Sequence, residues 1–453
     1  MPLESYLARN RERHLEELIE FLRIPSVSAD PKHKGDVRRA AEYLKERFDA
    51  LGFTSEVHDT PGHPLVLAER RVDENAPTVL IYGHYDVQPP DPFDLWEHPP
   101  FEPTVTDGRL IARGASDDKG QVYAHLKAVE ALLDAQPGTK LNILFLVEGE
   151  EEVSSTNLAP FIEANRERLA ADIVLISDGA MLGPDQPSLT YGLRGIVYVE
   201  VRVKAADRDL HSGAYGGAVP NAINALARMI AGLHDDEGRI TVPGFYDDVQ
   251  PITERERESL AKLPFDEKRF LANVGVKASP GEAGYSVIER IWTRPTLDVN
   301  GIGGGFQGEG SKTVIAAQAM AKISCRLVPD QQPRRIFELL REHLRRLAPA
   351  GVEVEVRHLN DGPPGVVPLE SPALETASQA IEAVWGKSPE FVRTGGSIPV
   401  VATFQKELGG DVIMLDMGLE TDGAHAPNEH FMLENYFRGI HTSAELLRRL
   451  AAD

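Results

Sequence analysis

Cysteine is almost absent from this chain of 453 residues, since Cys325 is the only one. A single cysteine excludes an internal disulfide and predicts a reducing, cytoplasmic location. The first 24 residues lack a continuous apolar run, so we expect an amphipathic helix there and neither a signal peptide nor a membrane span. Internal repeats and low-complexity tracts are also lacking, which excludes a solenoid.

Positive charge is in deficit. The chain has 48 Lys and Arg against 70 Asp and Glu, a formal net charge of −22. A field of this sign repels nucleic acid and anionic membranes, so neither is an expected partner. The rest of the composition, 42% hydrophobic and 26% charged, is typical of a soluble globular protein. Its length predicts two or three domains.

Short apolar runs alternate with helical patterns in the first part of the chain. The runs 77–83, 141–147 and 171–177 are typical of strands that are buried on both faces, and helical periodicity covers 119–135. This alternation predicts an α/β domain with a mixed, largely parallel sheet flanked by helices.

From about residue 195 the apolar residues alternate strictly with polar ones. Such strands, with one covered and one wetter face, are predicted at 195–204, 322–328 and 352–358. Helices are predicted between them, at 221–233 and 334–348. The order strand, helix, two strands, helix, strand predicts a ferredoxin-like α+β domain.

The α/β pattern returns after residue 360, so the smaller domain is predicted to interrupt the larger one. The returning segments are a helix at 373–385, a strand at 411–417 and a helix at 433–450. We therefore predict a discontinuous larger domain, residues 1–193 and 361–453, and an inserted domain, residues 194–360. The charged segment 235–290, punctuated by Pro and Gly, is predicted to be an insertion in the latter.

Histidine and acidic residues follow the predicted strands of the larger domain or precede its helix. They are His84, Asp86, Asp117, Asp118, Glu151, Glu152, Asp178 and His425. Singly, each has an ordinary explanation, such as a helix N-cap for Asp117 or a turn for Asp178. Ligands of open α/β sheets bind at the carboxyl ends of strands. Together, the residues therefore predict a divalent-metal site at that edge.

The charges favour two metal ions. Two dications carry four positive charges. The carboxylates of Asp117, Glu152 and Asp178 would neutralise three of these charges, and a bound hydroxide could neutralise the fourth. A carboxylate such as Asp117 can bridge two ions about 3.5–4 Å apart. Asp86, two residues after His84, can hold the other N–H of a ligand imidazole.

The strand at 141–147 ends in a dense acidic run, "EGEEE". Neighbouring residues of an extended chain point to opposite sides, so Glu151 and Glu152 should not both ligate one metal. One can ligate while the other takes a proton from the metal-bound water. Spacing alone leaves open which residue does which.

A set of ordered motifs carries a family resemblance over nearly the whole chain. The motifs are "GHYDVQP", "GRLIARGASDDKG", "VEGEEE", "ISDG", "YGLRGI", "DLHSGAYGG", "CRLVPD", "TGGSIPV" and "DGAHAPNE". They resemble the di-zinc aminoacylase/carboxypeptidase metallopeptidase family, and within it the carnosinase-type cytosolic nonspecific dipeptidases.

The resemblance implies a role for most motif residues. The metal ligands would be His84 and Asp178 for one ion, Glu152 and His425 for the other, and Asp117 for both. Glu151 would be the general base and Asp86 would orient His84, whereas Glu148 and Glu150 receive no role and are expected to be peripheral. The substrate-binding residues would be His211, Thr313, Arg326 and Ser397.

The implied activity is hydrolysis of the amide bond of dipeptides or similar small peptides with a free C-terminal carboxylate. The inserted domain would act as a lid and join two chains in a homodimer. His211 would be catalytic as well as substrate-binding, because it would reach the partner's site and help to stabilise the tetrahedral oxyanion. Zinc is the expected metal, although manganese and cobalt suit the same ligands. The alternatives are an N-acyl-amino-acid deacylase with the same site and an inactive peptide-binding relative. The retained Glu151, His211 and metal ligands argue against the latter.

Overall fold

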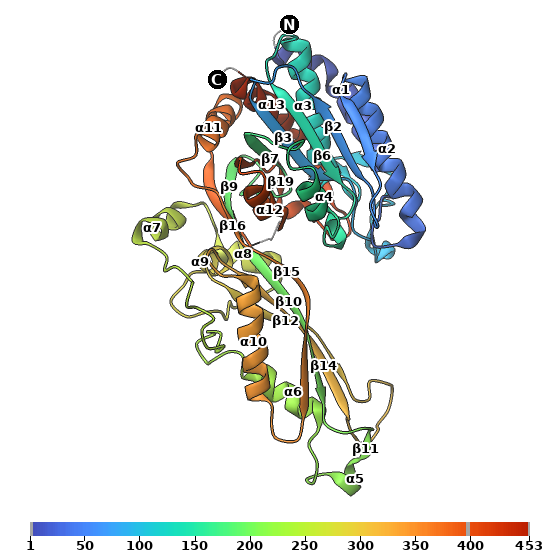
Figure 1. The fold of residues 1–453 in the computed structure, drawn as a ribbon, viewed down its shortest axis with the longest axis vertical. Helices are drawn as coiled ribbons and strands as arrows, with labels where there is room; N and C mark the ends of the chain where they lie inside the picture. Colours follow the sequence, from blue (N-terminus) through green and yellow to red (C-terminus); the bar gives the residue numbers. More distant parts are fainter. Residues whose placement is uncertain (1–2, 396–398, 452–453) are drawn as a thin grey trace. The chain divides into compact units, whose positions relative to one another are not determined.

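The computed structural model describes residues 3–395 and 399–451, and the chain divides into two compact units. Unit 1 comprises Met1–Tyr191, Val367–Val392 and Thr403–Asp453, and unit 2 comprises Gly192–Val366 and Arg393–Ala402. Figure 1 shows the elements of both units along the chain. The roles of catalytic domain and lid, with the boundaries given above, stay predictions.

Unit 1 is built on a mixed sheet. Its strands are β1 (Thr54–His58), β2 (Leu65–Arg70), β3 (Thr78–His84), β6 (Asn142–Glu148), β7 (Ile173–Ile176) and β18 (Asp411–Met414), with β9 (Ser188–Leu193) at the boundary of the unit. They lie in the order β1-β2-β6-β3-β7-β18-β9. The neighbours among β6, β3, β7 and β18 are parallel, and the outer pairs are antiparallel. The predicted mixed α/β fold is confirmed, with parallel pairing confined to the centre.

Helices cover this sheet and bury its apolar residues. They are α1 (Leu3–Leu22), α2 (Lys34–Ala50), α3 (Lys119–Ala135), α4 (Leu158–Ala164), α11 (Pro372–Trp385) and α13 (Leu433–Leu450). All residues of β3 and β6 are buried, which explains their continuous apolar sequences. Their alternate residues Val79, Ile81, Ile143 and Phe145 join one core with residues of α1, α2, α3, α11 and α13.

Short elements complete unit 1. They are β4 (Thr104–Thr106), β5 (Arg109–Ile111), β8 (Ala180–Met181), β19 (Gly418–Leu419), β20 (His430–Met432), η1 (Pro31–His33), η2 (Phe93–Leu95), η3 (Glu151–Val153) and η4 (Glu420–Asp422). The elements β17 (Glu390–Thr394) and α12 (Pro399–Glu407) cross the boundary between the units.

Unit 2 is a two-layer α+β domain. Its main strands are β10 (Gly195–Lys204), β12 (Thr296–Gly304), β14 (Gln318–Leu327) and β15 (Glu353–Gly362), and its larger helices are α6 (Ala222–Ala231) and α10 (Pro333–Leu347). The strands are antiparallel in the order β12-β14-β10-β15, which is the predicted ferredoxin-like arrangement. The alternating valines of β10, from Val197 to Val203, face a core shared with α6 and α10.

The remaining elements of unit 2 are short. They are β11 (Leu210–His211), β13 (Val314–Ile315), β16 (Gly365–Val366), α5 (Ser212–Tyr215), α7 (Glu254–Lys262), α8 (Glu267–Asn273) and α9 (Val287–Thr293). The predicted insertion 235–290 therefore holds α7, α8 and the start of α9. Across residues 3–395 and 399–451, every helix is too short or too polar to cross a membrane.

Candidate active site

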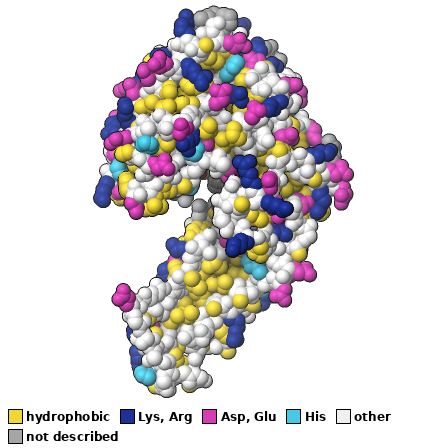
Figure 2. Space-filling model, turned by 180° about the vertical axis from the view of Figure 1, so that it is seen from behind, with side chains coloured by type: hydrophobic (Ala, Val, Ile, Leu, Met, Phe, Trp, Pro, Cys, Tyr) yellow, Lys and Arg dark blue, Asp and Glu magenta, His cyan; other side chains and the backbone are white. Residues whose placement is uncertain are grey.

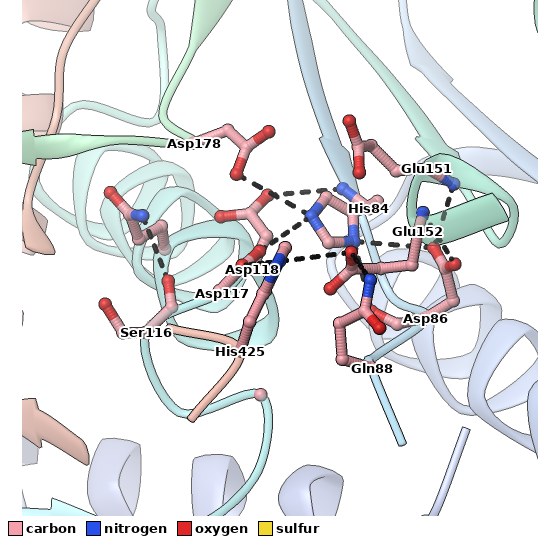
Figure 3. Close-up of polar contacts among 12 residues, drawn as sticks. His84, Asp86, Gln88, Ser116, Asp117, Asp118, Glu151, Glu152, Asp178 and His425 are labelled. Atoms are coloured by element: carbon pink, nitrogen blue, oxygen red, sulfur yellow. Dashed lines mark hydrogen bonds and ion pairs between the residues drawn. The ribbon is translucent and has the colours of Figure 1, made fainter. Parts of the chain in front are cut away.

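The predicted metal ligands of unit 1 converge at the carboxyl ends of its central strands. β3 ends at His84, η3 follows β6, and Asp178 follows β7. Asp117 and Asp118 immediately precede α3. Figure 3 shows these side chains together with His425, which comes from the loop after η4. The residues after β3, β6 and β7 meet in one place because these parallel strands end at the same edge of the sheet.

His84 lies at the centre of one group of potential ligands. It is fully buried, and its Nε2 is 3.1 Å from Oδ1 of Asp117 and 3.6 Å from Oδ1 of Asp178. Its backbone N–H donates to Oδ2 of Asp118 at 3.2 Å. Oδ1 of Asp118 is buried without a hydrogen-bond partner in the described part of the chain. Ligand atoms of His84, Asp118 and Asp178 lie within 4.8 Å of one another, close enough for one ion.

A second group lies beside the first. Nε2 of His425 is 2.9 Å from Oδ2 of Asp117 and 3.2 Å from Oε2 of Glu152. Gln88 donates to the same oxygen of Glu152 at 2.7 Å. Ligand atoms of Asp117, Glu152 and His425 lie within 4.8 Å of one another. Because the two oxygens of Asp117 face His84 and His425 separately, this carboxylate is placed to serve both groups (Figure 3).

The donor set fits divalent cations. Burial, reinforced by the charges of Asp117 and Glu152, raises the pKa of Asp178 to about 6. Burial and the charge of Asp178 also raise the pKa of Asp118 well above its usual range. Hydrogen bonds to Asp117 and Glu152 raise the pKa of His425 to about 10. Such crowded acidic charge is relieved by a cation, and imidazole with carboxylate oxygens is a common ligand set for divalent metals.

Asp86 fixes the turn that carries Glu151 and Glu152. Its buried carboxylate accepts the backbone N–H of Glu151 at 3.2 Å and that of Glu152 at 3.1 Å. Nδ1 of His84 lies 3.0 Å from the backbone oxygen of Asp86 and 3.4 Å from its Oδ1. Asp86 is therefore placed both to orient the imidazole, as the resemblance implies, and to hold the turn.

The adjacent glutamates have different surroundings. Glu152 faces His425 and Gln88, whereas Figure 3 shows the Glu151 carboxylate apart from them, with no contact to the other residues drawn. Burial raises the pKa of Glu151 well above its usual range; the charge of His84 opposes this, and that of Asp178 adds to it. The separation fits one ligand and one proton acceptor.

The prediction that Glu148 and Glu150 are peripheral is wrong, because both are buried. Oε1 of Glu148 accepts hydrogen bonds from the hydroxyls of Tyr82 at 2.6 Å and Ser155 at 2.9 Å. Burial raises the pKa of Glu148 to about 8. Oε1 of Glu150 accepts the backbone N–H of His63 at 2.8 Å. The end of β6 thus carries buried acidic side chains that accept hydrogen bonds from other segments, while Oε2 of Glu148 has no hydrogen-bond partner among the described residues.

Glu429 is a structural residue of the site that the sequence did not single out. It is fully buried, and its carboxylate binds the loop that carries Asp117. The donors are Nη1 of Arg113 at 2.7 Å and the backbone N–H groups of Gly114 at 2.9 Å, Ser116 at 3.0 Å and Asp117 at 3.0 Å. Because Glu429 closely follows His425, it links the two loops that supply ligands. Its place in "DGAHAPNE" was the available signal.

The structure brings two predicted substrate-binding residues of unit 2 together. His211 ends β11, is exposed, and accepts the backbone N–H of Gly213 on Nδ1 at 3.0 Å. In the pairing of β11 with β13, His211 lies opposite Val314. Thr313 immediately precedes Val314, and its backbone oxygen accepts a hydrogen bond from the backbone N–H of Ser212, the residue after His211.

Arg326 lies at the other end of the same unit. The start of β14 lies beside β11, since the backbone N–H of Ala317 donates to Oδ1 of Asp209 at 3.0 Å. Arg326 is the second-last residue of β14. At about 3.3 Å per residue, the strand separates Arg326 from the His211 end by roughly 26 Å. Ser397, the fourth predicted residue, lies outside the described residues.

Comparisons with known proteins agree with the site. Residues 80–449 match the family described as Peptidase family M20/M25/M40. The chain is 34% identical to the Cys-Gly metallodipeptidase dug1 of Schizosaccharomyces pombe, over 99% of this chain and 98% of the relative. The structure of human carnosine dipeptidase 1 is similar with a TM-score of 0.87 and 30% identity, covering 100% of this chain and 98% of that one.

A second solved structure shows the same likeness. The M20 family metallo-carboxypeptidase Sso-CP2 of Sulfolobus solfataricus has a TM-score of 0.87 and 36% identity, covering 97% of this chain and 99% of that one. The resemblance to carnosinase-type metallopeptidases predicted from the motifs is thereby confirmed. The chain belongs to peptidase family M20/M25/M40.

Proposed function

We propose that this chain is a metallodipeptidase that hydrolyses the amide bond of dipeptides or similar small peptides with a free C-terminal carboxylate. The observation that carries the proposal is the pair of neighbouring ligand groups, with one oxygen of Asp117 near His84 and the other near His425. The full-length similarity to a Cys-Gly metallodipeptidase supports it, as does the 30% identity to the human Beta-Ala-His dipeptidase. None of these relatives favours an N-acyl-amino-acid deacylase.

Each ligand group would hold one divalent ion. In our proposal, His84 and Asp178 bind one ion, Glu152 and His425 bind the other, and Asp117 binds both. When bound, such ions polarise the scissile carbonyl and lower the pKa of water. Zinc, which is our proposed metal, suits these nitrogen and oxygen ligands.

Glu151 would act as the general base. Its side chain is free of the contacts that hold Glu152, so it can accept a proton from the attacking water and pass it to the leaving amine. Asp86 would keep both residues in place through their backbone N–H groups and would orient His84.

The substrate-binding residues require two chains in our proposal. A dipeptide spans about 7 Å when extended, whereas roughly 26 Å of strand separates Arg326 from the end of unit 2 that carries His211 and Thr313. One dipeptide cannot contact both ends of one unit. We therefore propose a homodimer in which His211 and Thr313 act in the partner's site. Arg326, and Ser397 in the undescribed segment, would act in their own.

The surface of unit 2 supports such a dimer. β12 lies at the edge of the sheet, and its Val299 and Ile302 are 39% and 60% exposed. Figure 2 shows hydrophobic side chains gathered over part of this unit. An edge strand with apolar side chains is a ready surface for a second copy. The single buried cysteine, Cys325, fits the proposed cytoplasmic location.

We expect two divalent ions per chain after saturation with zinc or manganese, as measured by elemental analysis. His425→Ala should lose one of them because it removes the imidazole of the second group. His211→Ala, which changes unit 2, should keep both and serves as the control. At most one ion in the saturated wild-type protein would contradict the two-metal proposal.

The proposed activity is tested with a panel of dipeptides, the matching C-terminally amidated dipeptides and N-acetyl amino acids. We expect the free dipeptides to have the highest kcat/KM. The amidated dipeptides lack the carboxylate for Arg326, and the N-acetyl amino acids lack the free amino group of a dipeptide. A preference for N-acetyl amino acids would favour the deacylase. Absence of any turnover in protein that carries both metals would favour the inactive peptide-binding relative.

A further inference from the structure

Two arginines lie together at one end of the sheet of unit 2. Arg194 immediately precedes β10, and Arg326 is opposite Ile196 in the pairing of β10 with β14. Because side chains alternate along a strand, Arg194, two residues before Ile196, shares that face with Arg326. The opposite face, which includes Val197, packs against the helices. The motif "YGLRGI" thus places a second guanidinium beside Arg326, although the resemblance gave Arg194 no role.

The Arg194 guanidinium is held on one side and unsatisfied on the other. Its Nε donates to the backbone oxygen of Gly395 at 3.1 Å. A side chain at Gly395 would begin 2.8 Å from Nη2 of Arg194, so the glycine leaves room for the guanidinium. Nη1 is shielded from solvent and has no hydrogen-bond partner among the residues that the structure describes. A buried charged donor without a partner is costly, so this atom is poised for an acceptor.

The charges near Arg194 favour an anionic acceptor. Burial, with the positive charge of Arg326, lowers the pKa of Arg194 to about 10. Burial also lowers the pKa of Arg326. Asp298 opposes both shifts, but it is exposed. Two neighbouring guanidinium groups are stabilised by a shared carboxylate.

We propose that Arg194 and Arg326 together bind the C-terminal carboxylate of the peptide substrate, which makes Arg194 a specificity-determining residue. The inference rests on the proposed dipeptidase function and deepens it. Arg326 alone would distinguish a carboxylate from an amide by charge. A second guanidinium, held by Gly395, adds a hydrogen-bond donor whose direction is set before the substrate binds. This donor increases the preference for a carboxylate over an amide.

The test measures binding directly, apart from turnover. The probe is a dipeptide analogue in which a methylene replaces the peptide carbonyl, used as the free carboxylate and as the C-terminal amide. Calorimetry with metal-saturated protein gives the affinity for each. Arg194→Gln should weaken binding of the free carboxylate analogue roughly 10- to 100-fold, as expected for loss of a charge-assisted hydrogen bond. It should weaken binding of the amide analogue less than about threefold. Arg326→Gln should show the same selectivity.

Two further variants sharpen the test. Arg194→Lys keeps the charge but lacks the planar guanidinium, so it should weaken binding of the carboxylate analogue by an intermediate factor. Arg202→Gln is the control, because Arg202 is exposed on the same face of β10 and pairs with Glu200 at 2.6 Å. It should leave both affinities unchanged. Circular dichroism and metal content establish that each variant is folded.

The outcomes separate this inference from the proposed function. Equal weakening of carboxylate and amide by Arg194→Gln would mean that Arg194 only positions the Gly395 segment, and no weakening would exclude it from the site; either overturns the inference. If wild-type protein hydrolyses no dipeptide, the proposed function fails. A selective loss of carboxylate binding in Arg194→Gln would still support the two-arginine site.

Discussion

Glu151→Gln should retain both metal ions and lose most of its turnover. General acid–base groups contribute about 10²–10⁴-fold, and glutamine cannot accept the proton. The substitution preserves the shape of the side chain, and the backbone N–H of residue 151 keeps its acceptor on Asp86. We therefore expect a lower kcat, measured on the best dipeptide of the panel, with unchanged metal content by elemental analysis.

Glu152→Gln is the matched control, since it changes the adjacent residue in the same chemical way. Glu152 lies 3.2 Å from Nε2 of His425 and accepts from Gln88. Loss of its charge should loosen one metal ion, and added metal should restore part of the activity. If Glu151→Gln loosened the metal and Glu152→Gln kept it, the two roles would be exchanged.

The elements around the site were predictable where periodicity decides the structure. The predicted strand 195–204 is β10, and the predicted helix 119–135 is α3. In β10 every second residue faces a helix-covered core, so the alternation is strict. β3 is buried along its whole length, and its end directs His84 to the sheet edge. These patterns are local and appear in the sequence itself.

The hydrogen bonds that hold the site were less predictable because they join distant segments. Glu148 and Glu150 were expected to be peripheral because the resemblance gave them no role, but both are buried and accept hydrogen bonds from Tyr82, Ser155 and His63. Glu429 accepts hydrogen bonds from backbone groups more than 300 residues away in the sequence. Ser116, for example, lies 313 residues before it. Spacing along the chain carries no information on such partners.

The placement of Asp118 needed the structure. The resemblance assigned its neighbour Asp117 to both ions and gave Asp118 no role. In the structure Asp117 lies between the two imidazoles, whereas Asp118 joins the group of His84 and Asp178. The local backbone conformation sets these directions. Glu429 holds that backbone through the N–H of Asp117.

Two inactive variants, His211→Ala and Glu151→Gln, should restore activity when they are mixed under subunit exchange. Loss of one oxyanion donor typically lowers turnover about 10²–10³-fold, so His211→Ala alone should be nearly inactive with its metals intact. His211 is exposed at the end of unit 2 far from Arg326 and is therefore available to a second chain. In the mixed dimer, the site that keeps Glu151 receives His211 from the Glu151→Gln chain.

That site contains every proposed group, and the other site lacks two, so each mixed dimer should approach half of the wild-type turnover. The control is a mixture of Glu151→Gln with Glu152→Gln. Both residues belong to η3 of their own chain, so no combination restores a complete site and activity should stay low. Native mass spectrometry of differently tagged chains measures the exchange. If exchange is complete and the first mixture remains inactive, His211 serves its own chain, and the roughly 26 Å separation along β14 would then exclude Arg326 from the same dipeptide.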